Sequence, residues 1–348
     1  PFAGSVSALE RGGRRRDAKA VILVGRFFVV LLLALLPTGA IAQSASGVRV
    51  SRAAHLGWTN AWTLGNGTVE VVVVPETGRV MQFQFAGETN GPFWENPQLA
   101  GRSMPEAPWT AAHGSFGGDK TWPAPQSAWN WPPPDVFDAV PVEVRADGDT
   151  LVLASPVSPR FGIRTERRVS LALSEPVLRI RTRYVKVSGD PVEVGVWVIT
   201  QVRDPLAVFL PIPSGSRFPQ GTTTNWGVPS GVMTRSGDLL RLTRDPKDSH
   251  KIGNDGTSLV WIGRDAALRI DVPRVSGGTY GDDGCSVEVY TNPDPVPYVE
   301  LETLGPLRRL SPGEAMEITN TYTLFRRVLP DEEAEARRIL AAGGTAPR

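Results

Sequence analysis

Apolar residues in this chain come in short blocks separated by turn-forming residues, and this spacing limits the possible folds more than any other feature. With 36 glycines and 31 prolines, the chain has turn signals at regular intervals between Gly47 and Arg326. No block in this region shows sustained helical periodicity. The blocks predicted as strands are Val69–Val74, Val80–Phe85, Leu151–Ala154, Arg168–Leu173, Val177–Val185, Val192–Ile199, Ser258–Ile262, Leu268–Val272, Ser286–Tyr290, Tyr298–Thr303 and Ala315–Phe325.

These strands predict an all-β fold, a large antiparallel β-sandwich or barrel, rather than a βαβ fold. The length of 348 residues would also suit two domains. No shift in composition marks a linker, so we expect residues 43–348 to form a single domain. One substantial helix is predicted, the short C-terminal segment Glu332–Ala342, with Asp331 as its N-cap and acidic residues in its first turn.

The first 42 residues have the layout of a secretory signal peptide. Basic residues at Arg14–Arg16 and Lys19 precede the apolar stretch Val21–Leu36, and Ala40-Ile41-Ala42 forms a small-x-small cleavage site. We therefore predict cleavage after Ala42 and a periplasmic or secreted protein. The alternative is an uncleaved anchor, although the apolar stretch is short for a membrane span.

Composition excludes several classes of function. Six of the 37 basic and two of the 36 acidic residues lie in residues 1–42, which leaves 31 basic and 34 acidic residues. That balance is unsuited to nucleic-acid binding. One cysteine rules out a disulfide scaffold, and three histidines leave little material for a zinc site. We expect no metal or other cofactor, no nucleic-acid partner, no membrane contact after cleavage, and a monomer.

The segment Asn90–Asp135 differs from the rest of the chain because it is rich in Pro and Gly and holds five of the ten tryptophans. Proline removes a ladder hydrogen bond, so we do not expect central strands here. Long loops of this kind are often functional, and an exposed indole can stack on the apolar face of a sugar. Alternatively, the tryptophans close one end of the sandwich core. Trp122 and Trp129 are our candidates for sugar contacts.

Two glutamates stand two residues apart in Tyr298-Val299-Glu300-Leu301-Glu302-Thr303. On a strand, Glu300 and Glu302 point to one face, whereas Val299 and Leu301 point to the other. The Cα atoms of the two glutamates are then about 7 Å apart. Like charges this close raise the pKa of one carboxyl, which suits a general acid or base. The alternative is an ordinary solvated strand face.

The segment Gly117–Gln126 supplies further polar candidates. Its two leading glycines allow a sharp turn or a close approach of the backbone to a ligand. Its polar side chains could form hydrogen bonds to hydroxyls beside an indole, or they could form a structural ion pair in a tight turn. The candidates from this segment are Asp119, Lys120, Trp122 and Gln126, and those on or just after a later strand are Trp197 and Gln201.

Several short segments occur in an order that points to one superfamily. They are Pro75-Glu76-Thr77-Gly78-Arg79-Val80-Met81, Gly117-Gly118-Asp119-Lys120-Thr121-Trp122-Pro123, Ser286-Val287-Glu288-Val289-Tyr290-Thr291-Asn292-Pro293, Leu301-Glu302-Thr303 with Pro306, and Leu310-Ser311-Pro312-Gly313-Glu314. The second is similar to a Gly-Gly-x-x-x-Trp-Pro motif, and the last to a Leu-x-Pro-Gly-Glu motif. The chain thus resembles the galactose mutarotase-like (aldose 1-epimerase) superfamily, as an uncharacterised secreted bacterial branch.

The resemblance implies a β-supersandwich with a carbohydrate site on its concave sheet. In active members a glutamate removes the anomeric hydroxyl proton, a histidine protonates the ring oxygen, and the ring opens and recloses. Carried over to this chain, Glu302 matches the base, with Glu300 as the alternative. His113 resembles a histidine that lines the site, and Arg79 of the early turn is taken as a substrate contact.

The chain departs from the superfamily at the general acid. The segment Gly195–Gln201, where epimerases place that histidine, contains none. Lys120 would be the substitute if burial lowered its pKa. Three functions follow: an exported sugar-binding protein with epimerase chemistry through Glu302, a lyase or hydrolase that uses Glu300 and Glu302 with Lys120, and a non-catalytic glycan-binding or envelope module. The expected partner in each case is a sugar or an oligosaccharide.

Overall fold

The structure is a computed structural model that describes residues 47–104, 116–129 and 131–343, all within one compact unit of the chain. The predicted leader, residues 1–42, and His113 lie outside the described residues. None of the helices in the described part of the chain is long and apolar enough to cross a membrane.

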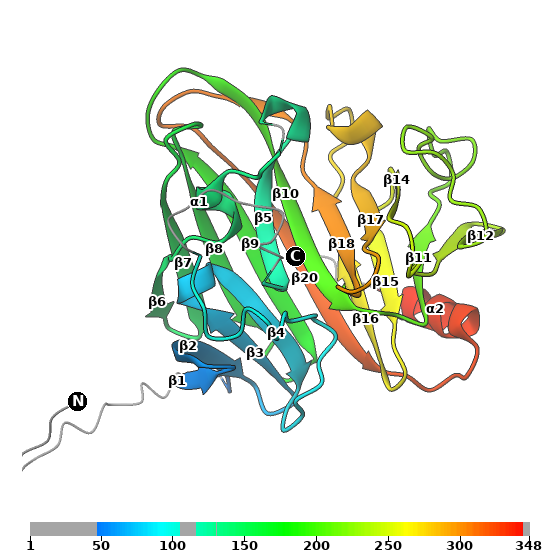
Figure 1. Cartoon of the computed structure of the whole chain (residues 1–348), viewed down its shortest axis with the longest axis horizontal. Coiled ribbons are helices and arrows are strands. Elements are labelled where there is room, and N and C mark those ends of the chain that lie inside the picture. The colour runs from blue at the N-terminus through cyan, green and yellow to red at the C-terminus, as the bar shows by residue number, and fades with distance from the viewer. Residues whose placement is uncertain (1–46, 105–115, 130, 344–348) are drawn as a thin grey trace, which may run out of the picture. The chain divides into compact units, whose positions relative to one another are not determined.

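Two antiparallel sheets of ten strands each make up the described fold (Figure 1). Sheet I has the order β1-β2-β3-β4-β5-β10-β18-β17-β14, and β19 pairs with β10. Its strands are β1 Arg49–His55, β2 Trp58–Gly65, β3 Val69–Val74, β4 Arg79–Phe85, β5 Gly118–Ala124, β10 Val192–Arg203, β14 His250–Asn254, β17 Val287–Thr291, β18 Tyr298–Leu304 and β19 Arg308–Leu310.

Sheet II has the order β12-β13-β11-β15-β16-β20-β9-β8-β7-β6. Its strands are β6 Glu143–Asp147, β7 Thr150–Val157, β8 Ile163–Leu171, β9 Val177–Lys186, β11 Ala207–Pro211, β12 Met233–Ser236, β13 Leu239–Leu242, β15 Ser258–Ile262, β16 Ala266–Asp271 and β20 Ala315–Arg326. The helices are α1 Asp135–Asp138 and α2 Glu332–Ala341, with single 3-10 turns η1 Pro75–Thr77, η2 Gln126–Ala128 and η3 Asp282–Gly284.

The predicted all-β class and the predicted short C-terminal helix are both confirmed. Asp331 caps α2, because its carboxylate accepts a hydrogen bond of 2.7 Å from the backbone N–H of Ala334. The apolar face of α2 buries Ala336 and Ile339 against Phe209 and neighbouring residues of sheet II. Each block that the sequence predicted as a strand overlaps a strand of the structure.

Strand β5 corrects one expectation, because it is a central strand within the proline-rich segment Asn90–Asp135. Pro123 lies in β5 opposite Val196 of β10. Its carbonyl accepts a hydrogen bond of 2.6 Å from Nε1 of Trp129, so this side of Pro123 faces away from β10. The ladder to β4 pairs Val80 with the earlier residue Asp119. The missing N–H of Pro123 therefore removes no bond from the ladder with β10.

A buried polar network joins the two sheets. Asp119 of β5 is fully buried between them. Its Oδ2 accepts hydrogen bonds from the hydroxyls of Thr200, at 2.6 Å, and Tyr322, at 2.5 Å. Its Oδ1 pairs with the guanidinium of Arg167, which comes from β8 of sheet II. Burying such a charge pair costs free energy, but removing one partner costs more because the other charge stays buried. Asp119 therefore holds the two sheets together.

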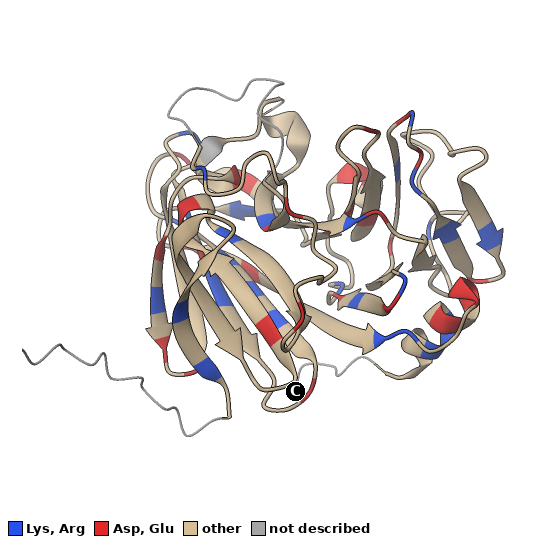
Figure 2. Cartoon of the chain, turned by 60° about the horizontal axis from the view of Figure 1, so that its bottom comes forward, with Lys and Arg blue, Asp and Glu red and all other residues tan. Residues whose placement is uncertain are grey.

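Exposed ion pairs differ from this network in their surroundings. Acidic and basic residues are interspersed along the strands (Figure 2). In sheet II, Arg183 pairs with Glu166, and Arg181 with Glu317, in solvent-exposed settings. Such surface pairs contribute little to stability because water screens both charges.

We expect Asp119→Asn to lower the free energy of unfolding by about 3–5 kcal/mol, because Arg167 would stay buried without its charge partner. Chemical denaturation at pH 7 measures the effect. The matched control is Asp147→Asn, which removes an exposed ion pair to Arg168 and should leave the denaturation midpoint nearly unchanged. Equal losses for the two variants would contradict a structural role for the buried pair.

Candidate functional site

Cross-strand register brings six of the predicted site residues together on one face of sheet I. The three rows of direct neighbours on β5, β10 and β18 are Lys120–Ile199–Glu302, Gly118–Gln201–Glu300 and Trp122–Trp197–Leu304. Directly opposed residues in antiparallel strands share a face of the sheet. We call this face, which is turned away from sheet II, the site face.

The alternation of residues on β18 fixes which groups reach the site face. Val299 and Leu301 are fully buried in the core between the sheets. Thr303 points the same way, because its hydroxyl accepts a hydrogen bond of 2.6 Å from Nδ2 of Asn320 on β20. The period of two then sends Glu300 and Glu302 to the opposite face, as the sequence predicts. Both are nonetheless buried rather than solvated.

One carboxylate, that of Asp138, holds three donors at the β5 side of the site face. Its Oδ2 accepts a hydrogen bond from Nη2 of Arg79 at 2.9 Å. Its Oδ1 accepts bonds from Nε1 of Trp122 at 2.7 Å and from Nζ of Lys120 at 3.2 Å. Burial opposes ionisation of Asp138, but the charges of Lys120 and Arg79 outweigh it and hold the pKa of Asp138 below its usual range.

The one-turn helix α1 positions Asp138. Prolines precede it, which favours a helix start because the first N–H groups of a helix have no partner within it. Phe137 then anchors the turn in the core, edge-on to Phe161 at 5.7 Å and to Tyr184 at 5.3 Å between ring centres. Sequence reasoning missed Asp138, because no motif or periodicity links α1 to β5.

Lys120 is held in place by Asp138 and by an aromatic ring. Its Nζ lies 3.9 Å from the ring centre of Trp122, within cation–π distance. Burial lowers the pKa of Lys120, and the attraction of Asp138 only partly offsets that effect. The pKa of Lys120 is therefore shifted in the direction that a lysine acting as a proton donor requires.

Glu300 is a buried carboxyl of the site face that hydrogen-bonds to a neighbouring strand. Its Oε1 accepts a hydrogen bond of 2.9 Å from Nε2 of Gln201, its direct neighbour on β10. Burial raises the pKa of Glu300 to about 7, although the positive charge of Lys120 partly opposes the shift. This carboxyl therefore exchanges its proton near physiological pH.

A second charged cluster surrounds Glu302. Its Oε2 accepts hydrogen bonds from Nε1 of Trp197 at 2.8 Å and from Nζ of Lys251 at 3.1 Å. The same ammonium lies 2.7 Å from Oε2 of Glu288, the direct neighbour of Glu302 on β17, and 3.9 Å from Asp282. Burial raises the pKa of Glu288 well above its usual range despite Lys251. The carboxylates in turn hold the pKa of Lys251 above its usual range, although its burial acts in the opposite sense.

Sequence reasoning missed Lys251 and Glu288. Alternation along the predicted strand Ser286–Tyr290 could have identified Glu288. Val287 and Val289 face the core, so Glu288 between them points to the opposite face. Gly253, opposite Glu288 on β14, makes room for this side chain, since a Cβ there would lie 2.7 Å from its Cγ. Nothing in the sequence paired Lys251 with this strand.

The remaining predicted residues lie elsewhere or play a supporting part. Asp119 faces sheet II and belongs to the network between the sheets, because alternation on β5 turns it away from Lys120. Trp129 is buried behind Trp122, with ring centres 5.6 Å apart. Gln126 is half-buried in η2, beyond the end of β5. Arg79 is fully buried against Asp138.

Gly117 and Gly118 pack so closely against neighbouring backbone that neither position has room for a Cβ atom. Both have positive φ angles, +96° and +69°. A Cβ on Gly117 would lie 2.1 Å from the carbonyl oxygen of Trp94, and one on Gly118 would lie 2.5 Å from that of Val80. Close packing of the chain thus accounts for this glycine pair.

Two of the three histidines lie in the described residues, and each is paired with a carboxylate. Nε2 of His55 lies 2.5 Å from Glu95, and Nε2 of His250 lies 3.1 Å from Asp245. Within residues 47–104, 116–129 and 131–343, no group of three or more His, Cys, Asp or Glu residues is arranged to hold a metal ion.

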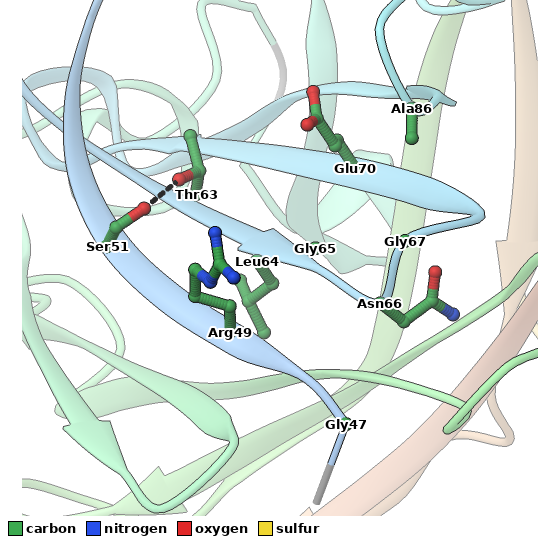
Figure 3. Close-up of a pocket in the computed structure, with 10 residues that line it drawn as sticks. All are labelled: Gly47, Arg49, Ser51, Thr63, Leu64, Gly65, Asn66, Gly67, Glu70 and Ala86. Atoms are coloured by element: carbon green, nitrogen blue, oxygen red, sulfur yellow. Dashed lines mark hydrogen bonds between the residues drawn. The ribbon is translucent and has the colours of Figure 1, made fainter. Parts of the chain in front are cut away.

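A cavity of about 390 Å³ lies elsewhere, at the β1–β3 end of sheet I (Figure 3). Arg49, Ser51, Thr63 and Glu70 are among its lining residues, and the two hydroxyls are 2.7 Å apart. None of the predicted site residues that the structure describes lines this cavity, so it is separate from the candidate site.

Many solved structures match this fold, among them the following three. The Slr1438 protein from Synechocystis sp. PCC 6803 is 13% identical, covers 77% of this chain and 96% of its own, and has a TM-score of 0.52. A galactose mutarotase-like protein from Lactobacillus casei ATCC 334 is 10% identical, covers 76% and 100%, and has a TM-score of 0.52. A TPR-domain containing protein from Parabacteroides distasonis ATCC 8503 is 15% identical, covers 77% and 47%, and has a TM-score of 0.51.

At these identities the likeness concerns the fold alone, and it confirms the predicted galactose mutarotase-like sandwich. No curated protein sequence matches the chain. The model of the family DUF4380, described as a domain of unknown function, matches residues 60–325, which is more than half of the chain. The chain therefore belongs to the DUF4380 family.

Proposed function

We propose that the site face binds a sugar and that Glu302 and Glu300 act on it as the base and the acid of an epimerase-like reaction. The observation that carries the proposal is the contrast between two neighbouring buried carboxyls. Glu302 accepts two N–H donors, one of them the Lys251 ammonium, whereas the pKa of Glu300 is raised to about 7 by burial. Two carboxyls in different environments can divide the acid and base roles.

In the proposed reaction Glu302 takes the proton of the anomeric hydroxyl, and protonated Glu300 gives its proton to the ring oxygen. The bond between the anomeric carbon and the ring oxygen breaks, and an open-chain carbonyl forms. Reversal of both transfers recloses the ring on either face. Glu300 thereby replaces the histidine that is missing from Gly195–Gln201. The positive charge of Lys120 lowers the pKa of Glu300 and so partly offsets the effect of burial. The fold shared with a galactose mutarotase-like protein supports the sugar as substrate class.

Glu302→Gln should slow the interconversion of hexose anomers by about 10²-fold or more, because a positioned base contributes a factor of this order. Polarimetry and anomeric NMR on glucose and galactose measure the rate above the uncatalysed background. Glu300→Gln should show a similar loss. The matched control is Glu317→Gln, which changes an exposed side chain of β20 in sheet II and should retain the full rate.

An unchanged rate in the Glu302→Gln variant would remove it as the base. Sugar-dependent quenching of tryptophan fluorescence without turnover of any hexose would point to the non-catalytic glycan-binding alternative. No quenching with any sugar would contradict the sugar site as a whole.

The raised pKa of Glu300 predicts a pH dependence of stability. The folded protein holds this proton more tightly than the unfolded chain, so the free energy of unfolding should fall as pH rises from about 5 to 8. In Glu300→Gln that part of the fall, up to about 3 kcal/mol, should be absent. Denaturation at a series of pH values measures the difference between the two proteins, and parallel curves would contradict the assignment.

We also propose that residues 1–42 direct export and are removed. The chain expressed in a bacterium with an initiator methionine should yield a periplasmic or secreted protein whose N-terminus is Gln43. Ala42→Phe should block this processing, because the cleavage site requires small residues. Edman sequencing or intact mass of fractionated cells measures both outcomes. Cytoplasmic protein that keeps residues 1–42 would contradict the proposal.

A further inference from the structure

Two exposed tryptophans contact the candidate site, and the proposed reaction uses neither of them. Trp131 is 58% exposed and Trp226 is 39% exposed, whereas Trp122 and Trp197 are buried. An indole in water leaves a large apolar surface unburied, and its flat face suits stacking against a ligand. Each ring is therefore a candidate contact surface for whatever the site face binds.

A continuous row of ring and cation contacts connects the two exposed rings. Trp131 lies edge-on to Trp122 at 6.3 Å between ring centres, and Trp122 lies edge-on to Trp197 at 5.4 Å. Nζ of Lys251 then lies 4.9 Å from the ring centre of Trp197 and 4.7 Å from that of Trp226. We call these five residues the aromatic row.

The aromatic row crosses the part of the site face between β5 and β14. Trp122 comes from β5 and Lys251 from β14, and β10, β18 and β17 lie between these strands. Four inter-strand spacings separate the two backbones, roughly 19 Å at about 4.8 Å each. The middle of the row is also the proposed reaction centre, because Trp197 and Lys251 both donate hydrogen bonds to Glu302.

The chemistry along the row favours a carbohydrate chain over an apolar partner. The exposed indoles do not form one continuous apolar patch, because the Lys251 ammonium lies beside Trp226 and the Asp282 carboxylate lies 3.9 Å from that ammonium. Apolar ring faces that alternate with charged hydrogen-bonding groups match a sugar, which has apolar C–H faces and a rim of hydroxyls. A single sugar ring at Glu302 would leave the outer indoles unused.

We propose that the aromatic row binds an oligosaccharide, with one sugar ring at Glu302 and further rings stacked on Trp131 and Trp226. The inference rests on the proposed sugar site and names its substrate class. A chain that engages both outer rings should bind more tightly than its monomer by about tenfold or more, since each stacked ring buries apolar surface.

Isothermal titration tests this with glucose against cellohexaose and maltohexaose, and with galactose against a β-1,4-linked galactohexaose. Trp131→Ala and Trp226→Ala should each weaken binding of the preferred hexamer by about tenfold and leave monosaccharide binding unchanged. Trp131→Phe should keep most of the affinity. The matched control is Leu173→Ala, which truncates a 61% exposed apolar residue of the loop between β8 and β9.

The outcomes separate this inference from the proposed function. Monosaccharide binding that equals hexamer binding, or hexamer binding that survives both tryptophan variants, would overturn the aromatic row and leave the sugar site intact. Absence of binding to every monosaccharide and hexamer would overturn the sugar site and this inference together. Circular dichroism of each variant establishes that it has folded.

Discussion

The pairing register of β5, β10 and β18 is the constraint on which the candidate site depends. A slip of one residue would turn every side chain of a strand to the opposite face. Here both faces carry buried charge, since Asp119 meets Arg167 between the sheets and Glu302 meets Lys251 on the site face. A slipped strand would leave both pairs broken in a low-dielectric setting, so the same charges that define the site also specify its register.

Charge balance is the second organising principle of the site face. Asp138 is shared by two buried cations, Arg79 and Lys120. The electrostatic influence of Glu300 reaches both cations, so its proton and the balance of this cluster are linked. Glu302 instead pairs with the Lys251 ammonium, which it shares with Glu288 and Asp282, so the two carboxyls on one strand face lie in different charge environments.

The sequence predicted the site where alternation within a strand was sufficient, and failed where partners come from distant segments. Glu300 and Glu302 followed from the period of two on β18. Asp138 and Lys251 reach them only through the sheet order, which no local pattern encodes. Asp119 was misplaced because its proline-rich segment was taken for a loop. If the segment had been recognised as a strand, alternation along β5 would have placed Asp119 and Lys120 on opposite faces.

The prediction of the strands was limited in a similar way. Most blocks of β-branched and other apolar residues were recognised as strands, although β11 and β13 were missed despite being largely buried. Strands β1, β6 and β12 were missed because none of their residues is buried. Such strands are held by pairing with neighbours rather than by burial of their own side chains. Their position in the order of the sheets therefore depends on interactions that hydrophobic spacing does not report.

The place of Lys251 has a consequence for the dynamics of the molecule. β14 ends the strand order of sheet I, and terminal strands open at lower free energy than central ones. When β14 detaches, its ammonium leaves with it, and Glu288 and Glu302 face each other across adjacent strands without a cation. Repulsion then favours proton uptake by Glu288, whose pKa burial already raises, so transient fraying of this edge and the protonation state of Glu288 are thermodynamically coupled.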